Sequence, residues 1–396
     1  MTTKSSLLIQ HANLLGPDEW LKNTSLFVQG GCIVALADAA ERAAQNVSEK
    51  ELSIIDASGR WIFPGIIDLH GDAFERDITP RAGTYFPLEL AMAANDSNLI
   101  ANGITTFFYS ITDGFEPGPR SRDTVRNLLN VLEKMAPRFA CQARVHIRHE
   151  KVNTQKHEEL LDWLASGRIH LLSLNDHLPL LDNPAKIERY LAGLRRRVPM
   201  SEEETKQFLA GLQNNRSLGE NQTLELVEEA QKHNIPLASH DDETIADIVR
   251  NQTFGTHIAE FPLCEKVASA ARKAGISVLM GAPNLVRGGS HVGAISVKDA
   301  LESGLVDILC SDYHYPSLFH APFLAERQGL LSLPLAWKLV SEHPAKAAGL
   351  GQQKGRIAPG YDADLLILNS LDGLPTSIER TLIKGKEVFC RGNALE

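Results

Sequence analysis

One short stretch of the chain ends an apolar run abruptly on side chains that can bind a metal ion. Residues 64–72 read PGIIDLHGD, so apolar residues lead directly into His70 and Asp72. A buried parallel strand typically ends in this way at its carboxyl edge. Residues two apart in a strand point to the same face, so His70 and Asp72 can chelate one divalent ion. The alternative is a capped turn with a solvated histidine and aspartate.

Other apolar runs also end on an acid, an imidazole or both. Besides the first pair, these endings carry Glu150, Asp176, His177, His240, Asp241, Asp242, Glu260 and Asp312, and a further run ends on Asn284. One such ending is ordinary capping of the following helix, and we assign Asp241 or Asp242 to that role. Capping does not call for histidine, so six endings of this kind favour a cluster of divalent cations.

Mixed nitrogen and oxygen ligands suit zinc, with manganese or iron as alternatives. We expect one or two divalent ions per chain. A bound ion lowers the pKa of water towards ~7 and so supplies a nucleophile at neutral pH. Asp312, at the end of the last apolar run, is the candidate catalytic base that takes or steers the proton.

The elements that must position these residues are eight apolar, β-branched runs that alternate with helix-like stretches. The runs lie at residues 65–72, 104–110, 143–150, 169–177, 235–243, 256–262, 276–284 and 306–313. Eight strand–helix units predict a (β/α)8 TIM-type barrel, in which catalytic groups gather at the carboxyl ends of the strands. Residues 178–219 are predicted to form an extra helical excursion after the fourth strand. A doubly wound open sheet is the alternative, which the lack of a glycine-rich phosphate loop disfavours.

Both ends of the chain have a different texture, with short alternating strands and Gly or Asp turns. We therefore predict two domains. Residues 1–63 and 352–396 form a small β-sandwich domain, and residues 64–351 form the barrel.

The composition excludes several classes of function. A net charge of −9 argues against a general nucleic-acid or anionic-membrane binder, although a small anionic substrate remains compatible with it. No apolar run approaches the ~18–20 residues that span a bilayer. The five scattered cysteines fit unpaired thiols in the cytoplasm. Whether the chain forms a homo-oligomer stays open.

Several longer stretches resemble the amidohydrolase superfamily, and within it the phosphonate-metabolism branch. They are PGIIDLHGDAFE, LASHDDET, VLMGAPNLVRGGSH and DILCSDYHYPSL, followed by GRIAPGYDADLLIL. The resemblance implies a metal-dependent barrel flanked by a β-sandwich built from both chain ends. It also implies hydrolysis of the triphosphate of a phosphonate-bearing ribose, with release of diphosphate.

The resemblance further implies roles for individual residues. The implied metal ligands are His70, Asp72, Glu150, His177, His240 and Asp312. The implied substrate-binding residues are Arg81, Arg287, His291 and Asn284. A planar guanidinium can bind phosphate through two hydrogen bonds, and a surface arginine is the alternative. For Glu150, the alternative to metal binding is a salt bridge with Arg148 or Arg144. For His177 and His240, the alternative is that they are packed core residues.

Two departures from the branch flank the expected substrate space. His149 stands beside Glu150 where a smaller residue is expected, and LLSLNDH continues as LPLLDN. A rival reaction is therefore hydrolysis of a C–N bond in a cyclic amide or amino-acid derivative. A rival from another class is a barrel without catalysis that serves as a scaffold.

Overall fold

A computed structural model describes residues 5–16, 19–81, 83–116, 120–179, 184–197, 200–289, 295–371 and 377–392. The chain divides into two compact units. The first contains residues 1–107, 135–143 and 279–396, and the second contains residues 108–134 and 144–278.

The central sheet contains eight parallel strands, as the sequence predicted. They are β6 (Ile66–Gly71), β7 (Ile104–Asp113), β8 (Gln142–Glu150), β9 (Leu171–Asn175), β10 (Leu237–His240), β11 (Ile258–Glu260), β12 (Ser277–Gly281) and β13 (Ile308–Cys310). Their order in the sheet follows their order in the chain. Every residue of β6 and β7 is buried, which is typical of parallel strands covered on both faces.

The first and last strands of this sheet meet within the first unit. Gly71 and Asp312 form a parallel bridge. The backbone N–H of Asp312 donates to the carbonyl oxygen of His70 over 2.9 Å, and that of Asp72 donates to Asp312 over 2.9 Å. These bonds join the edges of the sheet, and the fold is the predicted (β/α)8-type barrel.

The helices follow the strands. They are α1 (Asp38–Ala44), α2 (Glu75–Ile78), α3 (Leu88–Ala101), α4 (Arg122–Met135), α5 (His157–Ala165), α6 (Pro184–Arg197), α7 (Glu202–Asn214), α8 (Arg216–Lys232), α9 (Ile245–Thr253), α10 (Glu265–Lys273), α11 (Ala282–Arg287), α12 (Val297–Glu302), α13 (Tyr315–Arg327), α14 (Leu333–Lys338) and α15 (Glu342–Ala347). A 3-10 turn covers Ala136–Arg138. None of the described helices is long and apolar enough to cross a membrane.

The excursion after the fourth barrel strand is helical, as predicted. It contains α6 and α7 and runs into α8. Ser201 and Glu204 form a reciprocal capping box at the start of α7. Leu191 from α6 packs with Leu209 and Leu212 from α7 in a small apolar cluster, which also contains Val152 and Leu178. This cluster anchors the two helices beside the residues that follow β8 and β9.

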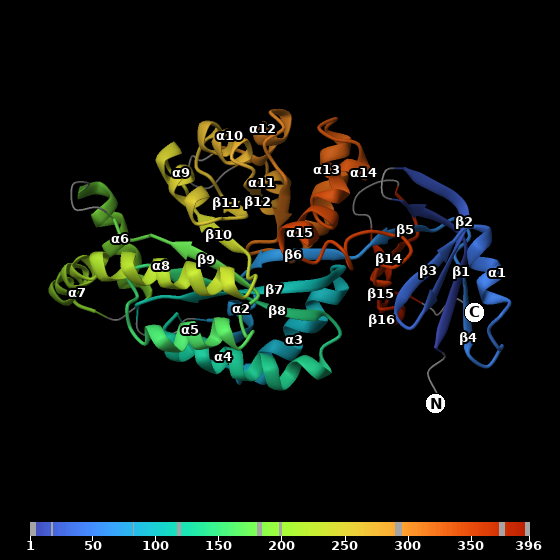
Figure 1. The fold of residues 1–396 in the computed structure, drawn as a ribbon, viewed down its shortest axis with the longest axis horizontal. Helices are drawn as coiled ribbons and strands as arrows, with labels where there is room; N and C mark the ends of the chain where they lie inside the picture. Colours follow the sequence, from blue (N-terminus) through green and yellow to red (C-terminus); the bar gives the residue numbers. More distant parts are fainter. Residues whose placement is uncertain are drawn as a thin grey trace. The chain divides into compact units, whose positions relative to one another are not determined.

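Both chain ends build a second, mixed sheet. Its strands are β1 (Ser6–Leu15), β2 (Trp20–Gln29), β3 (Cys32–Leu36), β4 (Leu52–Asp56), β5 (Trp61–Pro64), β14 (Leu365–Leu368), β15 (Ile378–Ile383) and β16 (Lys386–Cys390). Strand β14 pairs antiparallel with both β5 and β15, so the two ends of the chain lie side by side (Figure 1). The predicted pairing of the chain ends is therefore confirmed.

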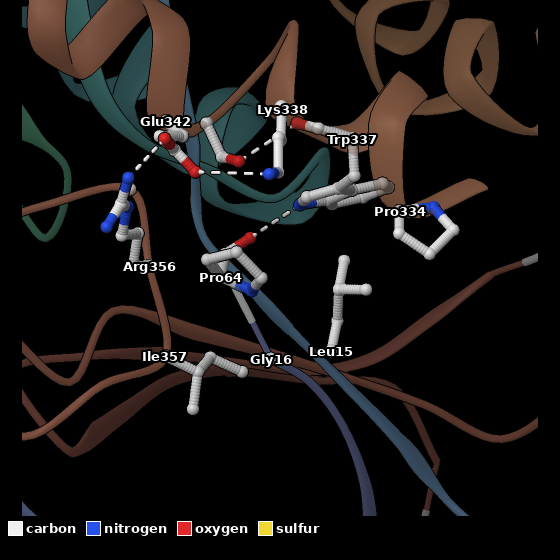
Figure 2. Close-up of a pocket in the computed structure, with 11 residues that line it drawn as sticks. Leu15, Gly16, Pro64, Pro334, Trp337, Lys338, Glu342, Arg356 and Ile357 are labelled. Atoms are coloured by element: carbon white, nitrogen blue, oxygen red, sulfur yellow. Dashed lines mark hydrogen bonds and ion pairs between the residues drawn. The ribbon is translucent and has the colours of Figure 1, made fainter. Parts of the chain in front are cut away.

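A pocket lies where the mixed sheet gives way to β6. Trp337 donates from Nε1 to the carbonyl oxygen of Pro64 over 3.0 Å, and Glu342 pairs with Arg356 (Figure 2). Its lining includes none of the predicted site residues. Pro64 precedes the amino end of β6, whereas catalytic groups of such barrels lie at carboxyl ends. We therefore regard the pocket as a structural feature.

Candidate metal centre

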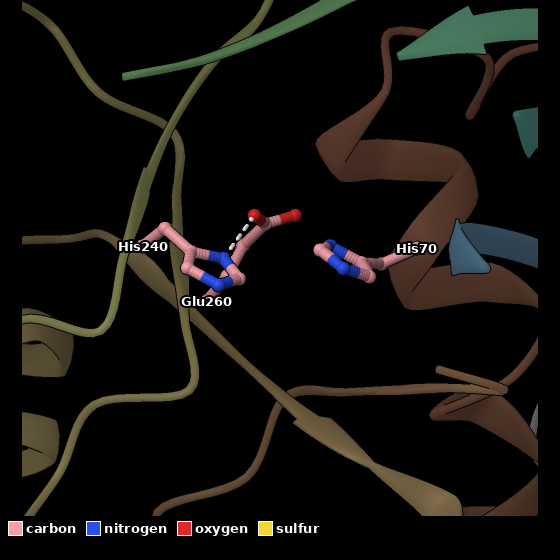
Figure 3. A group of neighbouring side chains, drawn as sticks. All are labelled: His70, His240 and Glu260. Atoms are coloured by element: carbon pink, nitrogen blue, oxygen red, sulfur yellow. Dashed lines mark hydrogen bonds and ion pairs between the residues drawn. The ribbon is translucent and has the colours of Figure 1, made fainter. Parts of the chain in front are cut away.

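Strands β10 and β11 of the second unit end on a histidine and a glutamate held together. His240 and Glu260 are register partners in the parallel ladder. Nδ1 of His240 lies 3.1 Å from Oε2 of Glu260 (Figure 3). A carboxylate only accepts hydrogen bonds, so Nδ1 carries the proton and Nε2 keeps its lone pair. The Glu260 side chain is fully buried and also accepts from the Ser173 hydroxyl over 3.2 Å.

A second histidine in the same unit is held in the same way. His177 follows β9, and its Nδ1 donates to Oε1 of Glu150 at the end of β8. The backbone N–H of His177 donates to the other oxygen of Glu150 over 3.3 Å. The charge of Glu150 raises the pKa of His177 to about 10. Burial raises the pKa of Glu150, but the charge and the hydrogen bonds of His177, together with the charge of Arg148, outweigh burial and lower that pKa.

Asp241 brings a carboxylate to these two histidines. His177, His240 and Asp241 each offer a ligand atom, and these atoms lie within 4.8 Å of one another. Asp241 has a left-handed backbone, with φ of 54°, and its N–H donates to the carbonyl oxygen of Glu260 over 2.9 Å. Burial would raise the pKa of Asp241, but the two histidines outweigh it and lower that pKa.

This donor set fits a divalent ion. Two imidazoles and a carboxylate are typical ligands of zinc and related metals. Each histidine also gives its Nδ1 to a carboxylate, an arrangement that orients metal-binding histidines and makes them more basic. The second unit could therefore hold a metal ion with Nε2 of His177, Nε2 of His240 and the carboxylate of Asp241, and binding of the ion would release the proton from Nε2 of His177. In this arrangement Glu150 can orient His177, and its predicted role as a metal ligand stays a prediction.

A cation of the chain also faces this group. Arg148 lies on β8, two residues before Glu150, and only 9% of it is exposed. Its Nη2 lies 3.1 Å from Nε2 of His240. Burial lowers the pKa of His240, and the guanidinium of Arg148 adds to that effect. His240 is therefore neutral and presents a lone pair, which is the state that binds metal.

The predicted capping role of Asp241 or Asp242 is wrong. Helix α9 is capped by Thr244, whose side chain accepts from the N–H of Asp247 in a capping box. Asp242 instead accepts from the Ser239 hydroxyl over 2.6 Å and from Asn251 over 2.8 Å. Asp242 thus ties α9 to β10, and this leaves Asp241 directed at the histidines.

In the first unit, the structure brings His70, Asp72 and Asp312 together through the backbone bonds of the barrel closure. His70 is almost fully buried, and Asp72 and Asp312 are partly exposed. Asp312 has a φ of 53°, a left-handed conformation that is uncommon for a residue with a side chain. Such a backbone conformation persists only where the surrounding structure enforces it. Residues in such conformations are often found at functional sites.

A buried carboxylate supports this closure. Oδ1 of Asp68 accepts from the N–H of Ser311 over 3.1 Å and from that of His70 over 3.3 Å. Asp68 is fully buried, and burial raises its pKa to about 6. It holds Ser311, the residue before Asp312, against β6.

The predicted substrate-binding residues are spread over several segments of the first unit. Arg287 is exposed, ends α11 and donates from Nη1 to the Tyr313 hydroxyl over 3.0 Å. Asn284 lies inside α11, where its carbonyl oxygen accepts from the N–H of Gly289 over 3.0 Å. Arg81 is exposed in a turn closed by the N–H of Thr84. His291 lies outside the described residues.

The sequence analysis did not predict a role in the metal centre for three residues of the second unit, namely Arg148, Asp241 and Glu260. A signal for Glu260 was present, because His240 and Glu260 end successive parallel strands and therefore align. The contact of Arg148 with His240 had no such signal. It depends on the path of a long side chain across the sheet.

The fold and this donor set define a class of protein. A parallel eight-stranded barrel with histidines and carboxylates at its carboxyl ends is characteristic of metal-dependent hydrolases. The family model described as "Amidohydrolase family" matches residues 61–388. The chain belongs to the amidohydrolase family.

A particular relative covers nearly the whole chain. Alpha-D-ribose 1-methylphosphonate 5-triphosphate diphosphatase of Escherichia coli (strain K12) is 32% identical over 391 residues, which are 97% of this chain and 100% of that protein. The resemblance to the phosphonate-metabolism branch is therefore confirmed.

Solved structures share the fold at lower identity. A dihydropyrimidinase from Brevibacillus agri NCHU1002 has a TM-score of 0.62 at 13% identity, covering 97% of this chain and 95% of that chain. A beta-aspartyl dipeptidase from Fervidobacterium islandicum AW-1 has a TM-score of 0.61 at 16% identity, covering 99% of this chain and 100% of that one. At these identities the likeness concerns the fold alone.

Proposed function

We propose that this protein is a metal-dependent diphosphatase that cleaves the triphosphate of alpha-D-ribose 1-methylphosphonate 5-triphosphate and releases diphosphate in phosphonate catabolism. The observation that carries the proposal is the 32% identity to the E. coli diphosphatase over 97% of this chain and 100% of that protein. The carboxylate-supported histidines of the second unit support a metal-assisted hydrolysis.

In this proposal, His177, His240 and Asp241 hold a divalent ion, with zinc as the first choice and manganese or iron as alternatives. His70 and Asp72 serve as further ligands, and Glu150 and Glu260 orient the two histidines. A bound divalent ion polarises a phosphoryl oxygen and lowers the pKa of water. We place the enzyme in the cytoplasm, in accord with the free thiols of all five cysteines.

Other residues of the chain transfer the proton and bind the substrate in this proposal. Asp312 accepts the proton of the attacking water, because its partly exposed carboxylate is reachable from solvent. Arg287 binds the departing diphosphate, since its guanidinium is exposed at the end of α11 and can form two hydrogen bonds with phosphate. Arg81 binds the same anion as a second positive charge, and Asn284 and His291 contact the substrate.

The test is a product analysis with purified enzyme and the triphosphate substrate. Phosphorus NMR should show inorganic diphosphate and the ribose 5-monophosphate in equal amounts. Release of orthophosphate alone, or no turnover of any ribose or nucleoside triphosphate, contradicts the proposal.

A substitution separates this reaction from hydrolysis of a C–N bond. Arg287→Ala should lower kcat/KM for the triphosphate by about 100-fold or more, the loss expected when a charged phosphate contact is removed. Arg327→Ala, an exposed arginine of α13, is the matched control and should leave kcat/KM unchanged. If both variants retain full triphosphatase activity, the assignment of Arg287 fails. Turnover of a cyclic amide or dipeptide instead supports the rival reaction.

A further inference from the structure

Arg148 takes up an unusual position for an arginine in a barrel strand. It belongs to β8, is 9% exposed and shares a strand face with Glu150, because the two residues are two apart. A buried guanidinium needs compensating partners, since removing a charge from water is costly. The partner that receives one of its N–H groups is His240, over 3.1 Å.

The contact uses the lone pair of His240 that a metal would need. Nδ1 of His240 faces the carboxylate of Glu260 and so carries the ring proton. Nε2 is therefore the acceptor, and it accepts from Arg148. The guanidinium of Arg148 thus occupies the position at Nε2 that a metal ion would take. A metal ion that binds through Nε2 must displace this guanidinium.

Arg148 is also close enough to influence the rest of the donor group. It lies on the same face of β8 as Glu150, which holds His177 by a hydrogen bond, and Asp241 directly follows His240 in the chain. A displaced guanidinium would thus remain beside the group that holds the ion. Its planar fork suits an oxyanion such as phosphate.

We propose that Arg148 competes with the divalent ion for Nε2 of His240, and that the displaced guanidinium then binds an oxyanion of the substrate beside the ion. The metal half of this inference stands on geometry alone. The anion half rests on the proposed function, because a phosphorylated substrate supplies the oxyanion.

The first measurement is zinc affinity, which does not depend on the identity of the substrate. Metal-loaded wild-type protein and Arg148→Met are dialysed against graded concentrations of a zinc chelator, and the retained zinc is quantified by elemental analysis. Arg148→Met should retain zinc about 10- to 100-fold more tightly, the range that corresponds to a competing charge-assisted hydrogen bond. Equal or weaker retention overturns the proposal.

Two further variants serve as controls for the zinc measurement. Arg144→Met removes an arginine four residues earlier on the same strand and should leave zinc retention unchanged. Arg148→Lys keeps the charge on a shorter reach and should give an intermediate affinity. Because the titration starts from metal-loaded protein, it also works for a variant whose metal-free form does not fold.

The second measurement is binding of orthophosphate to dialysed, zinc-loaded protein by calorimetry. Wild-type protein should bind orthophosphate, and Arg148→Met should bind it at least about 10-fold more weakly. If zinc retention rises in Arg148→Met but phosphate binding is unchanged, the anion half is wrong. If the enzyme fails to hydrolyse the triphosphate while both measurements succeed, the proposed function fails and this inference stands.

Discussion

The backbone N–H of Asp312 donates to the carbonyl oxygen of His70 over 2.9 Å, and this bond joins the last barrel strand to the first. The two residues are far apart in the chain, yet both are candidates for the chemistry. Asp68 strengthens the junction, because its buried carboxylate accepts the N–H groups of His70 and Ser311. The left-handed backbone of Asp312 is thus held from two sides.

Replacing Asp68 should loosen this junction. Asp68→Ala leaves two buried N–H groups without their acceptor, so we expect a loss of about 1–3 kcal/mol in the free energy of unfolding and a fall in kcat. Asp68→Asn keeps an acceptor oxygen and should retain most of both. Urea denaturation and steady-state kinetics measure the two effects. An Asp68→Ala protein as stable and active as wild type rules out this role.

Removing the buried carboxylate of Asp113 should destabilise the second unit strongly. Asp113 accepts from Nε and Nη2 of Arg122 over 2.5 and 2.7 Å and from Nδ1 of His149 over 2.6 Å. Asp113→Ala leaves the buried Arg122 uncompensated, which typically costs about 3–5 kcal/mol. This network also explains His149, which ties the end of β8 to β7.

The control for that variant is Asp123→Ala. Asp123 pairs with Arg126 and Lys156 at the surface, where 66% of its side chain is exposed. Exposed ion pairs contribute about 0–1 kcal/mol, so this variant should unfold nearly as wild type does. Equal losses in the two variants, measured by urea denaturation, are inconsistent with a special role for Asp113.

Removal of the metal should lower stability, and the candidate ligands should be needed for the effect. A chelator should reduce the free energy of unfolding by about 3 kcal/mol relative to protein with free metal at about 100 times its dissociation constant. His240→Ala should retain little metal after dialysis and respond weakly to the chelator. His233→Ala, a histidine at the end of α8 that pairs with Glu229, should behave as wild type. Thermal unfolding measures the stability, and elemental analysis measures the metal content. A normal metal content in His240→Ala contradicts the assignment of His240 as a metal ligand.

Stability should also fall in mild acid because of His170, away from the metal centre. Its Nδ1 accepts from the N–H of Val145 over 3.1 Å, and burial lowers its pKa to about 4. Between about pH 6.5 and pH 4 the unfolded chain binds more protons than the folded protein, so the free energy of unfolding decreases as the pH falls. The share of His170 is about 1–3 kcal/mol.

The check is to compare urea midpoints of wild type and His170→Gln at pH 7 and pH 4.5. The variant lacks the titrating ring, so its midpoint should change less with pH. Parallel curves for the two proteins would exclude His170 as the source of the dependence.

The sequence alone determined the strand order, the barrel and the pairing of the two chain ends. These follow from patterns that are local in the chain, such as apolar runs that end on polar residues and alternate with amphipathic helices. The same patterns singled out His177 and His240, because imidazoles at strand ends are unusual whatever their surroundings. The long segments ASHDD and GAPNLVRGG were sufficient to indicate the family.

The tertiary structure decided the partners of each side chain. Register places Glu260 behind His240, and the short loop after β9 turns His177 onto Glu150. Capping of α9 by Thr244 leaves Asp241 directed at the histidines, which the local sequence could not distinguish from a cap. Arg148 reaches His240 across the sheet. Such contacts join residues on different strands, so they depend on packing and side-chain direction and not on any pattern within one segment.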